Sequence, residues 1–206
     1  MENIKTENLE KRIIEVAKCL FIENGYENTS MSDIALQVGI NRSALHYYFR
    51  TKDKMFQVVF GTIVSSFLPK IQTVFEEDIP FTEKLDKILD IYIQICLDNP
   101  HLPMFIIQES QRDVNHLISA AENLHLDSYL QIIRNSILDE MGKGILKEIP
   151  VSIIFATFYS QMIFPFLTKN IMIAFFADNE KNYIIFLRQW KFYIIDNMKR
   201  LLIEKD

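Results

Sequence analysis

Apolar residues recur at the helical spacing, rather than the strand spacing, along nearly the whole chain. Ile13, Ala17 and Phe21, for example, follow one another four residues apart and would share one helix face. The chain also contains only 5 glycines in 206 residues, where average usage of about 7% would supply roughly 14. Sandwiches and barrels need many Gly- and Pro-rich turns. The sequence therefore predicts an all-α fold.

Residues that typically end or begin helices separate the apolar segments. Gly25 and Gly39 can accept the left-handed backbone that terminates a helix, and Ser30 with Asp33 forms a capping-box sequence. Asn41 is a good N-cap for the next helix. The pattern predicts about nine helices, at residues 6–24, 31–38, 42–49, from the cap at 51 toward 70 or beyond, 81–98, 104–113, 117–141, 150–168 and 179–203.

The bulk composition excludes several protein classes. Apolar residues make up 49% of the chain, which is enough for a large core and too many for a disordered protein. The two cysteines form no disulfide framework, and the mixed-charge N-terminus has no apolar stretch of a signal peptide, so we expect a cytoplasmic protein. Residues 149–168 carry no charge, but their polar residues and prolines favour a buried helix over a membrane span.

The two short helices around Gly39 have the spacing of a helix-turn-helix motif, whose second helix fits the DNA major groove. Leu45, Tyr48 and Phe49 would point inward from the second helix. That arrangement leaves a polar outer face with one small residue, made of Arg42, Ser43, Ala44, His46 and Tyr47. Arg can read guanine with two hydrogen bonds, and Ser, His and Tyr can bond phosphates or base edges.

The net charge of −5 first argues against a nucleic-acid partner. Its distribution weakens that objection, because residues 1–55 hold 8 basic and 8 acidic residues while residues 56–206 hold 14 and 19. Residues 42–54 carry a local excess of +3. A positive strip beside an exposed helix suits phosphate contact, although an ordinary solvated helix face can look the same.

A longer string makes the motif specific. Its elements, in chain order and without gaps, are Ala17 with Leu20-Phe21, Gly25-Tyr26, Thr29-Ser30, Asp33-Ile34-Ala35, Val38-Gly39-Ile40, Ala44-Leu45, Tyr47-Tyr48-Phe49 and Lys52-Asp53. This string, residues 6–56, resembles the N-terminal domain of the TetR-type (tetracycline-repressor family) transcriptional regulators. The resemblance predicts a helix-turn-helix DNA-binding domain at residues 1–52 and a helical effector-binding and dimerisation domain at residues 53–206.

The resemblance implies a homodimer that binds a palindromic double-stranded DNA operator, usually as a repressor, and responds to a small effector without a cofactor. One position departs from the family pattern, because His46 stands where a tyrosine is common. Its contact, to a phosphate or to a base, is therefore open. By the family pattern, the residues that contact DNA are Ser30, Ser32, Arg42, Ser43, Ala44, His46, Tyr47 and Lys52.

The last predicted helix has an apolar arc about twice as wide as one packing surface needs. The excess favours an intersubunit four-helix bundle that it would form with the helix at 150–168, while a two-sided core helix within one chain is the alternative. For the dimer interface we expect Phe155, Tyr159, Tyr183, Leu187, Trp190 and Ile194.

An effector pocket should be mostly apolar with a few polar groups. The candidates on otherwise apolar helices are Tyr92, Gln94, Phe105, Gln108, Glu109, Tyr159, Gln161 and Met162. The same residues also suit an ordinary core with polar edges. Because the sequence contains no nucleophile elbow, phosphate-binding loop or metal-ligand spacing, we expect neither an enzyme nor a metal protein. The alternative function is an all-helical protein-interaction module without DNA binding.

Overall fold

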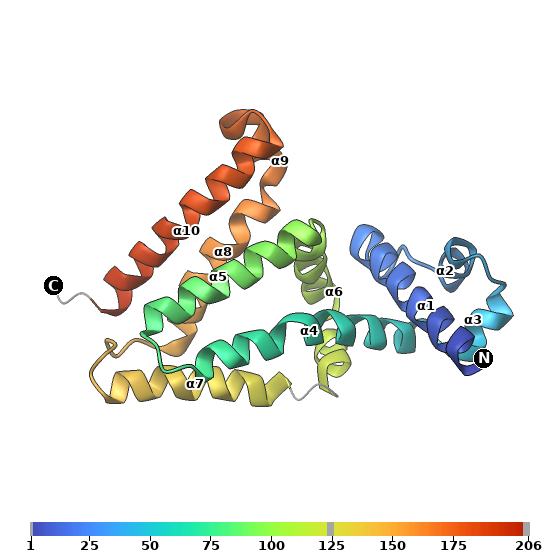
Figure 1. The fold of residues 1–206 in the computed structure, drawn as a ribbon, viewed down its shortest axis with the longest axis horizontal. Coiled ribbons are helices and arrows are strands. Elements are labelled where there is room, and N and C mark those ends of the chain that lie inside the picture. The colour runs from blue at the N-terminus through green and yellow to red at the C-terminus, as the bar shows by residue number, and fades with distance from the viewer. Residues whose placement is uncertain (1, 123–125, 204–206) are drawn as a thin grey trace. The chain divides into compact units, whose positions relative to one another are not determined.

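The computed structural model describes residues 2–122 and 126–203 of the chain, and over these residues it is helical without strands (Figure 1). The all-α prediction is confirmed. The elements are α1 (Glu2–Asn24), α2 (Met31–Val38), α3 (Arg42–Tyr48), α4 (Lys52–Glu76), α5 (Phe81–Asp98), α6 (Leu102–Glu122), α7 (Leu126–Gly142), α8 (Val151–Leu167), α9 (Lys169–Met172), the π-helical segment η1 (Ile173–Ala177) and α10 (Glu180–Leu202).

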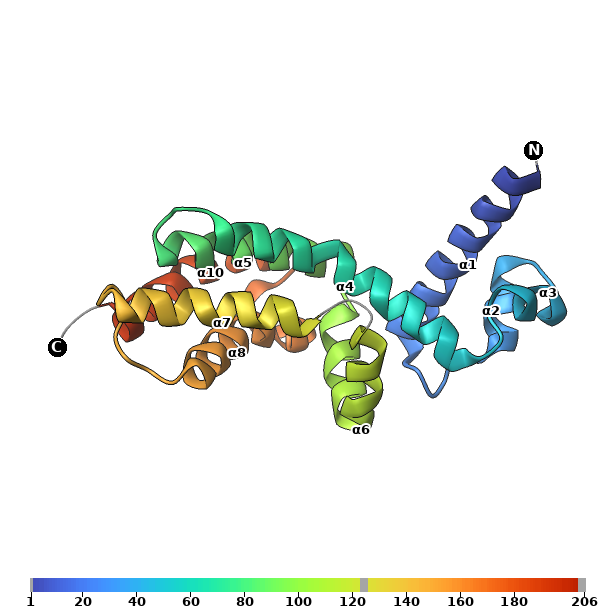
Figure 2. The same ribbon diagram turned by 90° about the horizontal axis from the view of Figure 1, so that it is seen from below.

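The chain divides into two compact units, which we describe one at a time. The first combines Met1–Ser66 with Met104–Leu126 and so contains α1, α2, α3, the start of α4 and most of α6. Figure 2 shows α2 and α3 as a short pair beside the long α1. Side chains buried without solvent exposure hold this unit together, among them Ile13, Phe21, Leu45 and Phe56.

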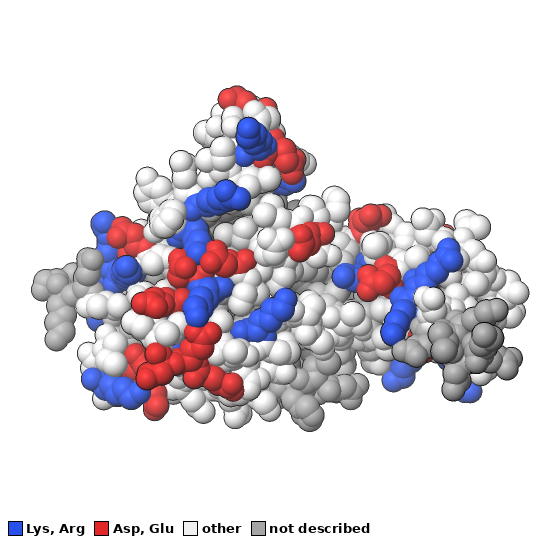
Figure 3. Space-filling model, in the orientation of Figure 1, with Lys and Arg blue, Asp and Glu red and all other residues white. Residues whose placement is uncertain are grey.

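The second unit combines Phe67–Pro103 with Asp127–Asp206. Within it α8 and α10 run antiparallel and are connected through α9 and η1 (Figure 1). Its core joins α5, α8 and α10 through buried side chains that include Leu89, Ile154 and Met198. On the surface, acidic and basic side chains interleave (Figure 3).

Polar contacts fix α10 against its neighbours in this second unit. Lys191 of α10 bonds Asp86 and Asp90 of α5, with N–O distances of 2.9 and 2.6 Å. The Trp190 indole donates to the Gln161 backbone oxygen of α8 at 2.9 Å. The orientation of α10 about its own axis is therefore set by contacts within one chain.

Several predicted boundaries are wrong. The helix expected at 117–141 is divided between α6 and α7. Instead, α6 begins at Leu102 and runs through a kink at Asp113, where φ is −161° and ψ is 91°. The Asp113 carboxylate accepts the His116 N–H at 3.0 Å and so caps the turn after the kink. Residues 169–177, for which no element was predicted, form α9 and η1, and the division of function between residues 1–52 and 53–206 stays a prediction.

Two stretches are long and apolar enough to be compared with a membrane span. They are α4, with 39% of its most apolar window buried, and α8 taken together with the segment Lys169–Ala177, which is bent by 67° from it. Core helices of soluble proteins meet the same criterion. Because buried faces of α4 and α8 contribute to the cores of the two units, this is weak support for a membrane role.

Candidate nucleic-acid interface

The turn between α2 and α3 is built by the residues that predicted it. The Ser30 hydroxyl accepts the Asp33 N–H at 3.1 Å, and the Asp33 carboxylate accepts the Ser30 N–H at 2.9 Å. The Ser30 hydroxyl also donates to the Asp33 carboxylate at 2.6 Å. This bond first, and the one from the Ser30 backbone N–H second, hold the pKa of Asp33 below its usual range. Gly39 ends α2 with φ of 79°, a left-handed conformation that other residues adopt at a cost. The Asn41 side chain then caps α3 by accepting the Ala44 N–H at 2.8 Å.

The face of α3 that was predicted to contact DNA is mostly exposed to solvent. Leu45 and Phe49 are buried as predicted, whereas Tyr48, also expected inside, is only half-buried and packs edge-on against Tyr47 with ring centroids 5.5 Å apart. Tyr47 itself is 82% exposed. The other predicted contacts of α3 follow the same orientation, with Arg42, Ser43 and His46 exposed and Ala44 half-buried.

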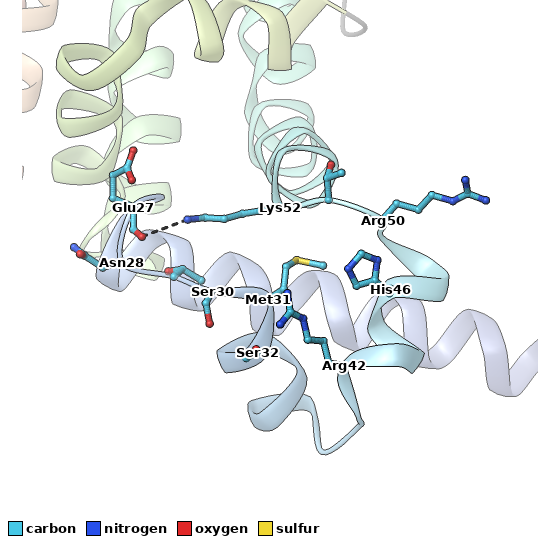
Figure 4. Close-up of a pocket in the computed structure, with 11 residues that line it drawn as sticks. Glu27, Asn28, Ser30, Met31, Ser32, Arg42, His46, Arg50 and Lys52 are labelled. Atoms are coloured by element: carbon cyan, nitrogen blue, oxygen red, sulfur yellow. Dashed lines mark hydrogen bonds between the residues drawn. The ribbon is translucent and has the colours of Figure 1, made fainter.

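A surface hollow of about 470 Å³ lies between the start of α2, the start of α3 and the start of α4 (Figure 4). We call it the head hollow. It brings together five of the eight predicted DNA contacts, which are Ser30, Ser32, Arg42, His46 and Lys52. Ser43, Ala44 and Tyr47 do not line it.

Positively charged side chains line the head hollow. Arg42, Arg50 and Lys52 line it, with Glu27 as the acidic member. Figure 4 shows the side chains of Arg42 and His46 both extending toward Met31, while Arg50 points away from them. Arg50 was not among the predicted contacts, although it belongs to the positive strip at residues 42–54 that the sequence already showed. A concave surface with this charge suits an anion such as a phosphate.

Tyr26, in the turn between α1 and α2, connects the head hollow to α6 within the first unit. Its backbone N–H donates to Glu109 Oε1 at 2.9 Å, and its hydroxyl donates to Asp53. The Lys52 ammonium and the Arg112 guanidinium both lie against its ring, 4.1 and 4.4 Å from the centroid. Burial, and then the bond to Asp53, raises the pKa of Tyr26. The hydroxyl therefore keeps its proton and remains a donor.

On α6, three polar side chains form a continuous row. Glu109 is only 2% exposed, and its Oε2 accepts from Arg112 Nε at 2.8 Å. Arg112 Nη2 is 2.8 Å from His116 Nδ1. His116 Nε2 is buried without a hydrogen bond, 3.6 Å from Asp53 Oδ1. We call Tyr26, Asp53, Glu109, Arg112 and His116 the Tyr26 cluster.

Sequence reasoning missed this cluster. A signal was present, because Glu109, Arg112 and His116 stand at i, i+3 and i+7 and so share one side of a helix. Glu109 was instead predicted to line an effector pocket. The structure gives its carboxylate two partners, the Tyr26 N–H and the Arg112 guanidinium. The neighbouring candidates differ, since Phe105 is buried against Phe56 with centroids 6.1 Å apart while Gln108 is exposed.

Comparison with known proteins tests the resemblance to TetR-type regulators. A model described as bacterial regulatory proteins of the tetR family matches residues 13–59. The fatty acid metabolism regulator protein of Bacillus subtilis (strain 168) is 25% identical over 137 residues, covering 66% of this chain and 70% of that protein. Nucleoid occlusion factor SlmA of Photobacterium profundum is 25% identical over 150 residues, covering 69% and 74%. These matches confirm the resemblance to TetR-type regulators that the sequence showed.

Solved structures agree with this assignment at the level of the fold. The fatty acid degradation regulator FadR of Bacillus halodurans superposes with a TM-score of 0.66 at 15% identity, covering 90% of this chain and 97% of that one. Because the identity is low, the match supports the TetR-family fold alone. The relatives are transcriptional regulators rather than enzymes, and among the described residues no three His, Cys, Asp or Glu side chains gather as a metal site requires.

The remaining effector candidates lie in the second unit. Tyr92 and Tyr159 are half-buried and Met162 is buried, whereas Gln94 is exposed and bonds Asp98 at 2.9 Å. Gln161 is half-buried, with its side-chain oxygen 2.9 Å from the Asn197 amide. A second hollow of about 220 Å³, lined by residues between Met172 and Gln189, includes none of these candidates.

The thiol of Cys96 lies in the interior of the second unit and has tyrosine neighbours. Burial raises its pKa to about 12. Burial likewise raises the pKa of Tyr92 and Tyr159, with the neighbouring Cys96 as a smaller cause. At neutral pH the Cys96 thiol therefore keeps its proton and is a poor nucleophile.

The predicted dimer residues divide into two groups. Phe155 is 62% exposed, and Tyr159 and Trp190 are half-buried. The other three, Tyr183, Leu187 and Ile194, are at most 2% exposed within a single chain. Since they have no surface left to bury, their assignment to an interface is wrong. The outward apolar residues of α10 are instead Ile185, Phe192 and Tyr193.

Proposed function

We propose that this protein is a ligand-responsive transcriptional repressor that binds a palindromic operator as a cytoplasmic homodimer. A small, largely apolar effector would release it. The observation that carries the proposal is the exposed face of α3 beside the cation-lined head hollow. An exposed helix with polar side chains next to a positive concave surface suits simultaneous contact with base edges and phosphates.

In this proposal α3 enters the major groove. Arg42 would read guanine through two hydrogen bonds, and Tyr47 would contact bases or backbone. Ser30, Ser32 and Lys52, which line the head hollow, would bind phosphates and so fix the register. Because residues 1–55 are neutral overall, affinity for non-specific DNA should be low. Correct spacing of two heads should then decide binding.

The dimer would form through the outer faces of α8 and α10. Phe155 and Phe164 of α8 are 62% and 56% exposed, and Phe192 and Tyr193 of α10 are 72% and 64% exposed. Large apolar side chains that stay exposed on two helices packed side by side favour an interaction surface. Pairing two chains would give two copies of α3, which must match half-sites about 34–36 Å apart.

The effector would bind among the helices of the dimerisation domain, with Tyr92, Tyr159 and Met162 as the candidate lining. Sixteen phenylalanines and eight methionines provide apolar surface in this chain. The name of the Bacillus subtilis relative, a fatty acid metabolism regulator, supports an apolar effector. Binding would shift the population toward a head spacing that no longer fits the operator.

The test uses the full chain and a fluorescent duplex from its own promoter region. We expect Arg42→Ala and Tyr47→Ala each to weaken binding about tenfold or more, because each removes a contact to a base or the backbone. Lys54→Ala is the matched control, since Lys54 is exposed on the same segment but does not line the head hollow.

Parent-like binding by both α3 variants would contradict the assignment of α3 as the recognition helix. The protein's affinity should also fall steeply with salt. A folded parent without any salt-dependent duplex binding would favour the interaction-module alternative.

A further inference from the structure

We propose that Tyr26 is a positioning residue for DNA binding, which holds the Lys52 ammonium at the head hollow and is itself held by Glu109 and Arg112 of α6. The proposal rests on the function proposed above, because it assigns Lys52 a phosphate of the operator. It gives a role to the Gly25-Tyr26 element and to a buried carboxylate that the recognition surface alone does not use.

The first step concerns Lys52, whose long side chain is held in place before any DNA is bound. Its ammonium lies 4.1 Å from the centroid of the Tyr26 ring and donates to the Glu27 backbone oxygen at 3.3 Å. The aromatic ring and the carbonyl oxygen both attract the ammonium but carry no net negative charge, so the positive charge of Lys52 is kept. An ammonium has three N–H donors, so a phosphate can still be bound. A lysine that is already ordered loses less conformational entropy when it binds.

The second step concerns Tyr26, which is fixed at its backbone, its ring and its hydroxyl. Glu109 accepts its N–H, Asp53 accepts its hydroxyl proton, and its ring packs on Phe21 and Phe56 with centroids 6.0 and 5.2 Å away. Gly25 precedes it with φ of 78°, a conformation that brings the backbone close to α6. A Cβ at Gly25 would lie 3.8 Å from Glu109 Oε1.

The third step concerns Arg112, which balances two carboxylates. It bonds the buried Glu109 at 2.8 Å and lies 3.5 Å from the Glu27 carboxylate. Pairing makes the burial of Glu109 tolerable. Pairing also offsets the negative charge of Glu27, the acidic side chain that lines the head hollow. Loss of Arg112 would therefore release Tyr26 and leave Glu27 free to compete with a phosphate for Lys52.

The experiment is a double-mutant cycle on the full chain, with binding to the promoter duplex measured over a range of salt concentrations. Lys52→Ala removes one phosphate contact from each protomer, and so two from the dimer. It should therefore weaken binding about fivefold or more near 0.15 M salt and reduce the salt slope by about 2. Tyr26→Leu removes the ring and should cause most of the same loss. In the Lys52→Ala background, Tyr26→Leu should cost almost nothing further, because the two residues act through one contact.

Conservative variants separate positioning from folding. Tyr26→Phe keeps the ring under Lys52 and should retain near-parent affinity and salt slope. Arg112→Ala should weaken binding and Arg112→Lys should restore part of it. Where Tyr26→Leu fails to fold, as judged by circular dichroism, the Arg112 series run with and without Lys52→Ala provides the same test.

Additive losses in the cycle, or a folded Tyr26→Leu variant with the affinity and salt slope of the parent, would overturn the proposal. A different result would count against the proposed function itself, namely that the parent and Lys52→Ala alike fail to bind any duplex in a salt-dependent way.

Discussion

The α2–α3 pair and the α8–α10 pair show two ways in which a sequence specifies helices. In the first pair, local capping residues set three of the four boundaries, namely Ser30, Gly39 and Asn41. In the second pair, α8 begins at Val151, after Pro150, without a side-chain cap. Its mostly apolar residues give little indication of which side faces the core. Tertiary packing, rather than local sequence, decides the orientation of that pair.

The exposed surfaces differ in the same way. The exposed face of α3 is mostly polar, and a helix with one apolar side has only one way to lie on its core. On α10, buried and exposed apolar residues alternate around the helix, with Ile194 at 2% exposure and its neighbour Tyr193 at 64%. A polar exposed face suits DNA, whereas an apolar exposed face suits another protein surface.

Removing a core residue should have the largest effect on the recognition pair. Leu45 of α3 is completely buried, whereas Leu36 of α2 is 81% exposed. We expect Leu45→Ala to lower the free energy of unfolding by about 2–5 kcal/mol and Leu36→Ala to change it by less than about 0.5 kcal/mol. Urea unfolding followed by circular dichroism measures both, and equal effects would mean that α3 does not pack as described.

The next effect concerns the outer face of α10. If that face joins two chains, Phe192→Ala should weaken the dimer by about 1–2 kcal/mol, which is roughly tenfold in dissociation constant. Leu130→Ala on α7 is the control, since Leu130 is 51% exposed but lies on another helix. Sedimentation equilibrium measures the dimer. A parent protein that is monomeric at micromolar concentration would contradict the claim that the outer face of α10 joins two chains.

The glycines at the ends of α2 and α7 should differ in how much they contribute to stability. Gly39 has φ of 79°, and a Cβ added there would meet open space, so Gly39→Ala should destabilise the protein by about 1–2 kcal/mol through backbone strain alone. Gly142 ends α7 and also has open space. Gly142→Ala should therefore be neutral or stabilise by up to about 1 kcal/mol. Thermal unfolding distinguishes the two, and the opposite order would contradict the left-handed turn.

The capping box should produce the smallest effect, through pH. Because Ser30 lowers the pKa of Asp33 in the folded chain, the ionised carboxylate favours folding. That contribution is present above the ordinary carboxyl pKa of about 3.9 and is lost as the pH falls through the lowered value. The stability difference between the parent and Asp33→Asn should therefore shrink below about pH 4. A difference that stays constant from pH 7 to pH 3 would exclude the carboxylate as its cause.

Much of the recognition pair was predictable from sequence, because Ser30, Gly39 and Asn41 act on residues within four positions of themselves. The Tyr26–Glu109 bond was not, since it joins residues 83 positions apart. Local signals could not show whether Glu109 faced a ligand or another segment of the chain. For α10, the width of the apolar arc predicted two packing partners, but not which residues faced which partner.

Site-directed photo-crosslinking tests the central claim most directly, because it reports what each exposed face touches. A photoreactive phenylalanine analogue would replace either Tyr47 on α3 or Phe192 on α10, which are 82% and 72% exposed. With the promoter duplex present, we expect position 47 to yield protein–DNA adducts and position 192 to yield adducts between two copies of the chain. DNA adducts from position 192 and none from position 47, in a protein that binds the duplex, would contradict the account.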